Sequence, residues 1–280
     1  MSNYIKGVDI STVQQAVDFT WLKQHDIKFV VVRCAVGNDG TDARYASNIA
    51  AAKAAGLKVM AYHFLYPLPS DAAHPTRDPK VQAQTHFKAA NGELAAIDLE
   101  WPSYQDWGKW GCSSAQINQW ALDYLAEYER LDGRKPLLYT YPSFAKLVKF
   151  SAKMAEYPLW IASYTSSPTI PAPWKDWVMW QNAGGSALTL PSGIPVDTNV
   201  CKDLSLWGDY SKHEPLPEPP VAAPQLPTEA PVGAQPYRDT QTVPAAPAAP
   251  LAPPKSTFNF QNNPLVDLFR FLLKLIGVLK

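Results

Sequence analysis

The chain has 280 residues, of which 46% are hydrophobic and 18% are charged, and its 25 basic side chains balance its 25 acidic ones. A chain of this length and apolar content can bury the core of a barrel-sized domain and still carry an appendage. The zero net charge, together with the lack of a basic stripe in the first two hundred residues, argues against a nucleic-acid partner.

The first two hundred residues predict strands that alternate with helices. Apolar runs predict strands over residues 5–10, 29–36, 58–66, 94–101 and 137–141. Helices are expected to follow them over residues 18–25, 43–55, 79–90, 113–131 and 143–154. Three more strand-like segments, with no convincing helix between them, cover residues 158–164, 177–181 and 196–201. This order predicts an α/β fold, a closed parallel barrel that lacks its last helices.

The fourth predicted strand, LAAIDLEW at residues 94–101, carries the most informative pattern. Side chains alternate along a strand, so Asp98 and Glu100 should point one way while Ile97 and Leu99 point into packing. Neighbouring carboxylates at the end of an apolar strand are costly to bury, and each raises the pKa of the other. A carboxyl group that stays protonated near neutral pH is what cleavage of a glycosidic bond requires. The alternative is a solvated strand end with two acids of no function.

The working residues of such barrels lie at the C-terminal ends of the strands. Asp9, Asp98, Glu100 and the Tyr62 group lie near such ends. Asp197 lies near the start of the last segment, which could run antiparallel or irregularly. The gathering of acids from separate segments favours catalysis.

Two other polar residues interrupt apolar strands. His63 alternates away from its aromatic neighbours, so we expect a packed, hydrogen-bonded histidine rather than a base. Arg33 is expected to pair with Asp9 or Asp98, either in a structural ion pair or as a contact to substrate. The other histidines are scattered without ligand spacing, so no metal site is expected.

The three cysteines, Cys34, Cys112 and Cys201, are odd in number and form no Cys-x-x-Cys pair. We therefore expect buried free thiols rather than a disulfide framework or a zinc site. Residues 1–7 lack the apolar core of a signal peptide, so we expect synthesis in a cytoplasm without export by the ordinary route.

Between residue 6 and about residue 210 the chain resembles the glycoside hydrolase family 25 lysozymes, the Chalaropsis-type muramidases. No single motif is specific, but their order and spacing together are. The motifs are GVDIS at 7–11, YHF at 62–64, IDLE at 97–100, LYT at 138–140, LWIA at 159–162, WQ at 180–181 and VDTN at 196–199. The resemblance implies a TIM-like (β/α)5(β)3 barrel, in agreement with the predicted elements.

The resemblance also implies an activity, which is hydrolysis of the β-1,4 bond between N-acetylmuramic acid and N-acetylglucosamine in peptidoglycan, with no cofactor. It makes Glu100 the general acid. Asp98 would support Glu100, either by orienting the 2-acetamido group or by stabilising an oxocarbenium-like transition state. Asp9 and Asp197 match the two other active-site acids.

The substrate-binding residues implied by the resemblance line the groove: Tyr62, Phe64, Tyr139, Trp160 and Gln181. Each aromatic ring among them could instead fill the barrel core. Retaining, inverting and substrate-assisted routes all stay open, and the family favours substrate assistance.

Beyond the barrel the composition changes. We expect a catalytic barrel over residues 1–212, a disordered, extended Pro/Ala-rich linker over 213–257 and an amphipathic helix over 258–280. A narrow polar stripe on the segment from Leu265 to Lys280 predicts contact with a membrane or envelope. Protein–protein assembly and folding back on the barrel are the alternatives.

These observations predict a peptidoglycan-cleaving muramidase that acts on the cell wall or periplasm and resembles a phage endolysin or virion-borne lysin. A chitinase or endo-N-acetylglucosaminidase on a related barrel is one alternative. The apolar run at 95–97 disfavours it, because those enzymes usually carry more acids there. A non-catalytic sugar-binding or structural protein is another alternative, disfavoured because all four acids are present.

Overall fold

The structure is a computed structural model of the chain, and it describes residues 4–37, 40–67, 77–100 and 113–210, except the side chains of residues 186, 209 and 210. All of these residues belong to one compact unit, Met1–Pro217. The linker predicted over 213–257, the helix predicted over 258–280 and Cys112 lie outside the described residues.

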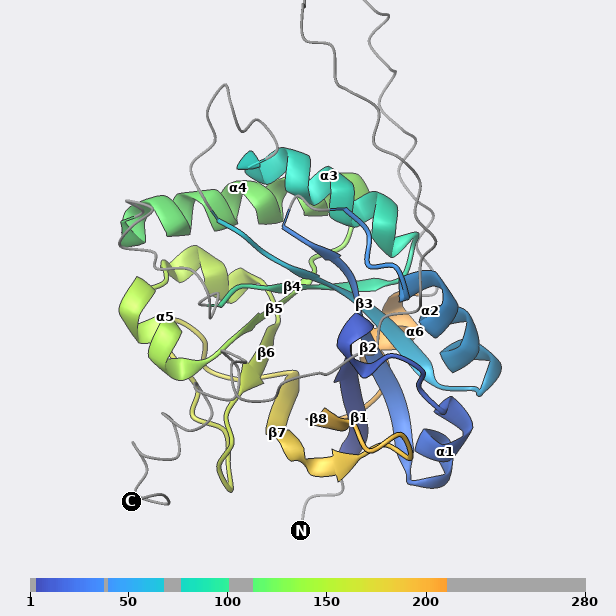
Figure 1. Ribbon diagram of the computed structural model, residues 1–280. Coiled ribbons are helices and arrows are strands. Elements are labelled where there is room, and N and C mark those ends of the chain that lie inside the picture. The colour runs from blue at the N-terminus through green and yellow to red at the C-terminus, as the bar shows by residue number, and fades with distance from the viewer. Residues whose placement is uncertain (1–3, 38–39, 68–76, 101–112, 211–280) are drawn as a thin grey trace, which may run out of the picture. The chain divides into compact units, whose positions relative to one another are not determined.

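Eight strands close into a barrel in sequence order, which confirms the predicted architecture (Figure 1). Neighbouring strands from the first to the seventh are parallel, and the eighth is antiparallel to both the seventh and the first. The strands are β1 Ile5–Ile10, β2 Ile27–Val36, β3 Lys58–Phe64, β4 Leu94–Asp98, β5 Leu137–Thr140, β6 Leu159–Ala162, β7 Met179–Thr189 and β8 Pro195–Cys201.

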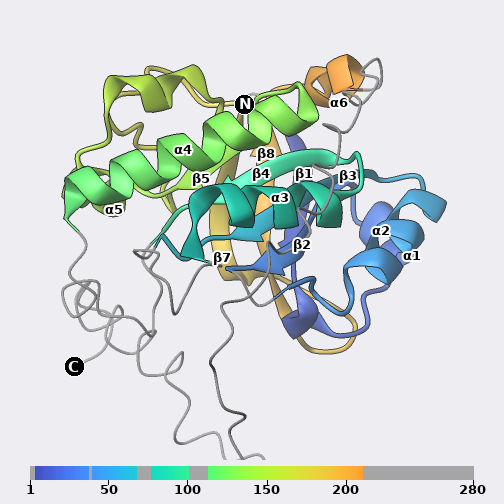
Figure 2. The same cartoon turned by 90° about the horizontal axis from the view of Figure 1, so that it is seen from above.

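Helices follow each of the first five strands, and α3 and α4 lie side by side against the barrel (Figure 2). The α-helices are α1 Phe19–Gln24, α2 Tyr45–Ala54, α3 Pro79–Ala90, α4 Ser114–Asp132, α5 Pro142–Val148 and α6 Ser205–Tyr210. The short 3₁₀ helices are η1 Thr12–Gln14 and η3 Ala152–Glu156. Local chemistry sets the starts of α3 and α4, since the Asp78 carboxylate and the Ser113 hydroxyl accept hydrogen bonds from the first free N–H groups.

The single helix predicted over residues 143–154 is wrong, because α5 ends at Val148. Lys149 adopts a left-handed conformation with φ of 53°. The Asn118 side chain on α4 takes over the freed backbone groups, donating to Val148 O at 3.2 Å and accepting from Ser151 N at 2.8 Å. A tertiary contact thus ends a helix that local propensity alone would continue.

The short helix α6 was not predicted, yet it closes the N-terminal end of the barrel. Trp207 on α6 packs its ring 5.2 Å from that of Phe29 inside the barrel. Its indole N–H donates to Val59 O at 2.7 Å. At this end the interior of the barrel is therefore closed by apolar rings.

The core has one cluster inside the barrel and two between the strands and the helices. On β4, Leu94 and Ala96 belong to the inner cluster, whereas Ile97 and, just after the strand, Leu99 pack outward, which confirms the predicted alternation. Cys34 and Cys201 are buried free thiols, as expected. In the described part of the chain no helix is both long and apolar enough to cross a membrane.

The space inside the barrel makes Gly7 of β1 a sensitive position. A Cβ atom at residue 7 would lie 2.2 Å from Phe29 Cε2. Because Phe29 is itself held against Trp207, we expect Gly7→Ala to lower the free energy of unfolding by about 1–3 kcal/mol. Urea denaturation measures this change.

The matched control is Gly208→Ala on the exposed surface of α6, where no atom lies within 4 Å of the added Cβ. This control should be neutral or slightly stabilising. Equal losses in the two variants would contradict the overpacking explanation.

Candidate active site

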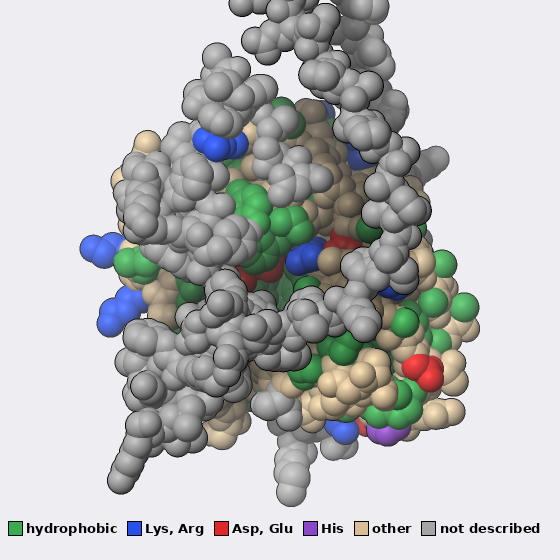
Figure 3. All heavy atoms as spheres, in the orientation of Figure 1, with side chains coloured by type: hydrophobic (Ala, Val, Ile, Leu, Met, Phe, Trp, Pro, Cys, Tyr) green, Lys and Arg blue, Asp and Glu red, His purple; other side chains and the backbone are tan. Residues whose placement is uncertain are grey.

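The four predicted acids come together at the C-terminal end of the barrel. Asp98 ends β4, and Glu100 follows two residues later, close enough for its charge to act on Asp98. Asp9 on β1 lies directly opposite Asp197 on β8 in the antiparallel pair. Acidic side chains are visible in a hollow in the middle of one face, beside a basic and several hydrophobic side chains (Figure 3).

Asp9 is held by two amides. Its Oδ2 accepts hydrogen bonds from Gln181 Nε2 at 2.8 Å and from Asn199 Nδ2 at 2.7 Å. Asn199 is itself fixed, because its Oδ1 accepts from the indole N–H of Trp160 at 2.8 Å. Burial and the nearby charge of Asp197 raise the pKa of Asp9 to about 7, although the two amide hydrogen bonds oppose this rise.

Asp197 is held by the backbone of β7. Its Oδ1 accepts from Gly185 N at 2.6 Å, and its Oδ2 lies 3.4 Å from Gln181 Nε2. Burial raises the pKa of Asp197, and the hydrogen bond from Gly185 opposes that rise. The same glutamine therefore touches both Asp9 and Asp197.

Asp98 and Glu100 form the more strongly perturbed pair. Asp98 is 7% exposed, and its Oδ1 has no hydrogen-bond partner among the described residues. Burial, and then the charge of Glu100, raise the pKa of Asp98 well above its usual range. Burial and the charges of Asp9 and Asp197 raise the pKa of Glu100 to about 8. Glu100 thus holds a proton at neutral pH and can give it to an incoming group.

The predicted aromatic residues divide into buried and partly exposed ones. Tyr139 and Tyr62 meet the ring of Trp160 edge-on at 4.7 and 6.2 Å, and all three belong to the inner cluster. Trp160 is only 2% exposed, so it supports Asn199 rather than offering a face to a ligand. Phe64, which pairs in register with Asp98, is partly exposed. Their roles as substrate-binding residues stay predictions.

His63 is a packed histidine, as predicted. It is fully buried, with Nε2 donating to Gly37 O at 2.8 Å and Nδ1 accepting from the Tyr124 hydroxyl at 2.8 Å. Burial lowers the pKa of His63 to about 4, so the ring is neutral. His63 therefore joins β3 to α4 and takes no part among the acids.

The ion pair predicted between Arg33 and Asp9 or Asp98 is wrong. Arg33 Nε donates to Asp42 Oδ2 at 3.1 Å, and the Asp42 side chain is only 2% exposed. The loop after β2 turns back to pair Thr41 with Ala35, and this brings Asp42 to the guanidinium. Arg33 still influences the acids, because its positive charge lowers the pKa of Asp98 without a direct ion pair.

Two further residues of the site were given no role in the sequence analysis, although Asn199 belongs to the VDTN motif. Asn199 stands two residues beyond Asp197, so strand alternation places both on one face of β8 and could have indicated it. Tyr164 lies just past β6, and its hydroxyl donates to Gln181 Oε1 at 2.8 Å while 58% of the residue stays exposed. Nothing in the local sequence distinguishes Tyr164 from a surface tyrosine.

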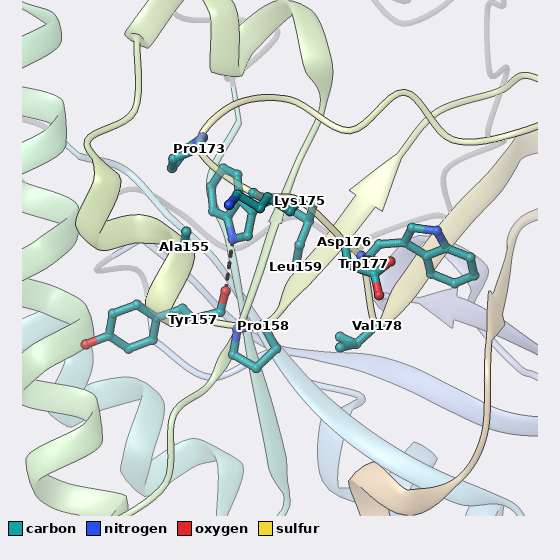
Figure 4. A pocket seen from close by; sticks show the side chains of 10 residues that line it. Ala155, Tyr157, Pro158, Leu159, Pro173, Lys175, Asp176, Trp177 and Val178 are labelled. Carbon is teal, nitrogen blue, oxygen red and sulfur yellow. Dashed lines mark hydrogen bonds between the residues drawn. The ribbon is translucent and has the colours of Figure 1, made fainter.

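A separate cavity of about 340 Å³ opens at the N-terminal ends of β6 and β7 (Figure 4). Tyr157, Lys175 and Trp177 are among its lining residues, and none of the predicted site residues lines it. Within the described ranges, no group of three or more His, Cys, Asp or Glu side chains is arranged to hold a metal ion.

The chain is similar to known proteins over most of this unit. The model of the family described as glycosyl hydrolases family 25 matches residues 8–188. The N,O-diacetylmuramidase of Chalaropsis sp is 27% identical over 197 residues, which make up 65% of this chain and 90% of that protein. Lysozyme M1 of Streptomyces globisporus is 26% identical over 209 residues, or 70% of this chain and 67% of that protein.

Solved structures agree with this similarity. A family GH25 lysozyme from Aspergillus fumigatus superposes with a TM-score of 0.64 at 26% identity, covering 75% of this chain and 98% of the other. The residues matched by the family model include Asp9, Asp98 and Glu100, whereas Asp197 lies beyond residue 188.

Because Asp98 is buried, the free energy of unfolding should fall as the pH rises. The pKa of Asp98 is raised in the folded state, so above about pH 4 folding takes up a proton at this residue. The free energy of unfolding therefore falls as the pH rises from about 4 through the pKa of Asp98 in the folded state. Asp98→Asn has no charge to bury. We expect it to be more stable than the wild type by about 1–3 kcal/mol near pH 8, with a smaller difference near pH 5.

Urea denaturation at the two pH values measures the difference. The control Asp176→Asn removes an exposed acid whose pKa is lowered by its hydrogen bond to Lys202, so it should gain no stability at either pH. An advantage of Asp98→Asn that does not change with pH would show that the ionisation of Asp98 is not its source.

Proposed function

The chain belongs to the glycosyl hydrolases family 25, and from this premise we propose how its four acids cleave peptidoglycan. The protein is a glycoside hydrolase of the lysozyme, or N-acetylmuramidase, type. The bond to be cleaved is the β-1,4 linkage between N-acetylmuramic acid and N-acetylglucosamine. One observation carries the assignment of the acid, which is the position of Glu100 two residues past the end of β4, in a site with three other carboxyl groups. Burial and the charges of Asp9 and Asp197 there raise the pKa of Glu100 to about 8.

Glu100 is the general acid of this proposal. Departure of the sugar oxygen requires a proton, and a carboxyl group with a pKa near 8 carries one through the neutral range. Burial and the charges of Asp9 and Asp197 both favour the protonated form. As the glycosidic bond breaks, the proton passes from the Glu100 carboxyl to the leaving oxygen, and Glu100 becomes a carboxylate.

Asp98 supports the sugar that is left behind. Its Oδ1 is buried without a partner among the described residues, and the N–H of a 2-acetamido group is a donor that would satisfy it. This contact would hold the acetamido oxygen near the anomeric carbon and so favours the substrate-assisted route. Stabilisation of the oxocarbenium-like transition state by the carboxylate is the second role open to Asp98.

Asp9 and Asp197 act indirectly in this proposal, through their effect on Glu100. They keep Glu100 protonated through their charges, and they are held by Gln181, Asn199 and the backbone of Gly185. A chitinase-like activity is the competing proposal. Assays on chitin oligomers and on peptidoglycan distinguish the two activities.

Replacing the general acid should abolish turnover. We expect Glu100→Gln to lower the release of reducing sugar from purified peptidoglycan by at least about 100-fold, because the amide cannot protonate the leaving oxygen. Mass spectrometry of the wild-type products should find chains that end in reducing N-acetylmuramic acid.

The wild-type rate should also fall as the pH rises above about 8, where Glu100 loses its proton.

Glu93→Gln is the matched control. Glu93 precedes β4 at the other end of the barrel, pairs with Lys53, and should be replaceable without loss of activity. Products that end in reducing N-acetylglucosamine, or full activity of Glu100→Gln, would refute the proposal.

The C-terminal segment carries a second proposal, which rests on sequence alone. We propose that the segment from Leu265 to Lys280 contacts a membrane or the cell envelope and that the enzyme serves bacterial lysis by a phage. An apolar segment with a narrow polar stripe and basic side chains suits an interface between lipid and water.

Removal of residues 256–280 tests this second proposal. The truncated enzyme should hydrolyse purified cell wall at the wild-type rate, because the barrel is retained, but it should kill fewer whole cells at equal concentration. Survival counts and wall turbidity measure the two effects. Equal killing by the truncated and full-length forms would exclude a role for the segment in reaching the envelope.

A further inference from the structure

One buried amide lies between two of the acids and two tyrosines. Gln181 Nε2 donates to Asp9 Oδ2 at 2.8 Å and lies 3.4 Å from Asp197 Oδ2. Its Oε1 accepts from the hydroxyl of Tyr139 at 3.0 Å and from that of Tyr164 at 2.8 Å. Four side chains, from β1, β5, β8 and the segment just past β6, thus meet at the amide of Gln181 on β7.

The hydrogen-bonding capacity of Gln181 is fully used. A side-chain amide has two N–H donors and an oxygen with two lone pairs, and all four positions have partners here. Gln181 is only 3% exposed. The amide cannot be reversed either, because its oxygen would then face two carboxylates. A direct bond from Gln181 to substrate would have to break one of these contacts.

Tyr164 is the most exposed member of this network. Its hydroxyl is tied to Gln181, yet 58% of the residue is exposed at the end of β6. An exposed ring with an anchored hydroxyl is held in one orientation, which is what stacking against a sugar requires.

Two glycines of β7 make room for this arrangement. A Cβ atom on Gly184 would come within 3.3 Å of the Tyr164 ring, and one on Gly185 within 3.3 Å of Pro195 Cβ. The register of β7 against β8 shifts on both sides of Ala183. Such an irregularity re-aims backbone groups, and here Gly185 N is directed at Asp197.

On the basis of the muramidase function above, we propose that Gln181 is a positioning residue that holds Asp9 and Asp197 as a spaced pair of acids, and that Tyr164 both contacts the glycan and locks Gln181. Gln181 was expected to bind substrate directly. Because all four hydrogen-bonding positions of its amide have partners, we assign Gln181 a positioning role. We assign the contact with the glycan to Tyr164.

The direction of the electrostatic effect follows from the contacts. The hydrogen bond from Gln181 lowers the pKa of Asp9, and the charges of Asp9 and Asp197 raise the pKa of Glu100. Without Gln181, Asp9 takes up its proton at higher pH and Glu100 loses its proton at lower pH. The pH range in which Asp9 is charged while Glu100 is protonated therefore becomes narrower.

The test measures kcat and KM on purified peptidoglycan across pH for Gln181→Leu, Tyr164→Phe and Tyr164→Ala. Gln181→Leu should lower kcat by about tenfold or more, move the acid limb of the kcat profile to higher pH, and leave KM within about twofold. Tyr164→Phe keeps the ring, so it should shift the limb in the same direction by less, with KM unchanged. Tyr164→Ala should also raise KM by about tenfold, because the stacking face is lost.

Matched controls separate these effects from general damage. Tyr157→Phe removes a hydroxyl that donates to Glu129, and Gln84→Leu removes an amide that donates to Glu127, both outside the acid cluster. Both should keep the wild-type profile. Thermal unfolding shows whether each variant is folded, and Tyr164→Phe, at an exposed residue, keeps the test usable if Gln181→Leu does not fold.

A readout independent of turnover separates this inference from the proposed function. Carbon NMR titration of the Asp9 carboxyl should give a higher pKa in Gln181→Leu than in the wild type. An inactive wild type with this shift would refute the muramidase function but not the positioning role. An unchanged Asp9 titration, or a raised KM with kcat and its pH limb unchanged in Gln181→Leu, would overturn the inference.

Discussion

Repulsion among four carboxyl groups in a confined space is the constraint on which the rest of this structure depends. Carboxylates that lie close together and out of water cannot all ionise, so some of them must hold protons or find donors. Asp9 has two amide donors and Asp197 has a backbone N–H, whereas Asp98 has an oxygen with no partner among the described residues. The unequal supply of donors lets chemically similar acids take different protonation states, and proton transfer to a leaving group needs that difference.

The barrel produces this inequality through the direction of its last strand. A parallel eighth strand would carry a residue near its start to the opposite end of the barrel, far from Asp9. Because β8 runs antiparallel between β7 and β1, Asp197 stands opposite Asp9, and Asn199 follows on the same face. The lack of a helix between β7 and β8 is thus connected with the site, since a short antiparallel return needs no crossover helix.

The sequence predicted what local chemistry decides and missed what distant contacts decide. The bounds of β1 and α3 and the alternation along β4 follow from neighbours in the chain, and all are confirmed. The break after Val148 depends on Asn118 on another helix, and the partner of Arg33 depends on a loop that folds back. Likewise, WQ at residues 180–181 pointed to the position of Gln181, but its four hydrogen bonds join segments that only the closed barrel brings together.

The position of α6 has a consequence for protein engineering. Trp207 seals the floor of the barrel, so the catalytic unit is complete only when the chain extends through this helix. The family model, in contrast, matches only as far as residue 188. A fusion joint chosen at that match boundary would remove β8 and leave Phe29 without the ring that covers it. Chimeric enzymes that replace the C-terminal part of the chain with another segment should therefore be joined after residue 210, so that the whole of α6 is kept.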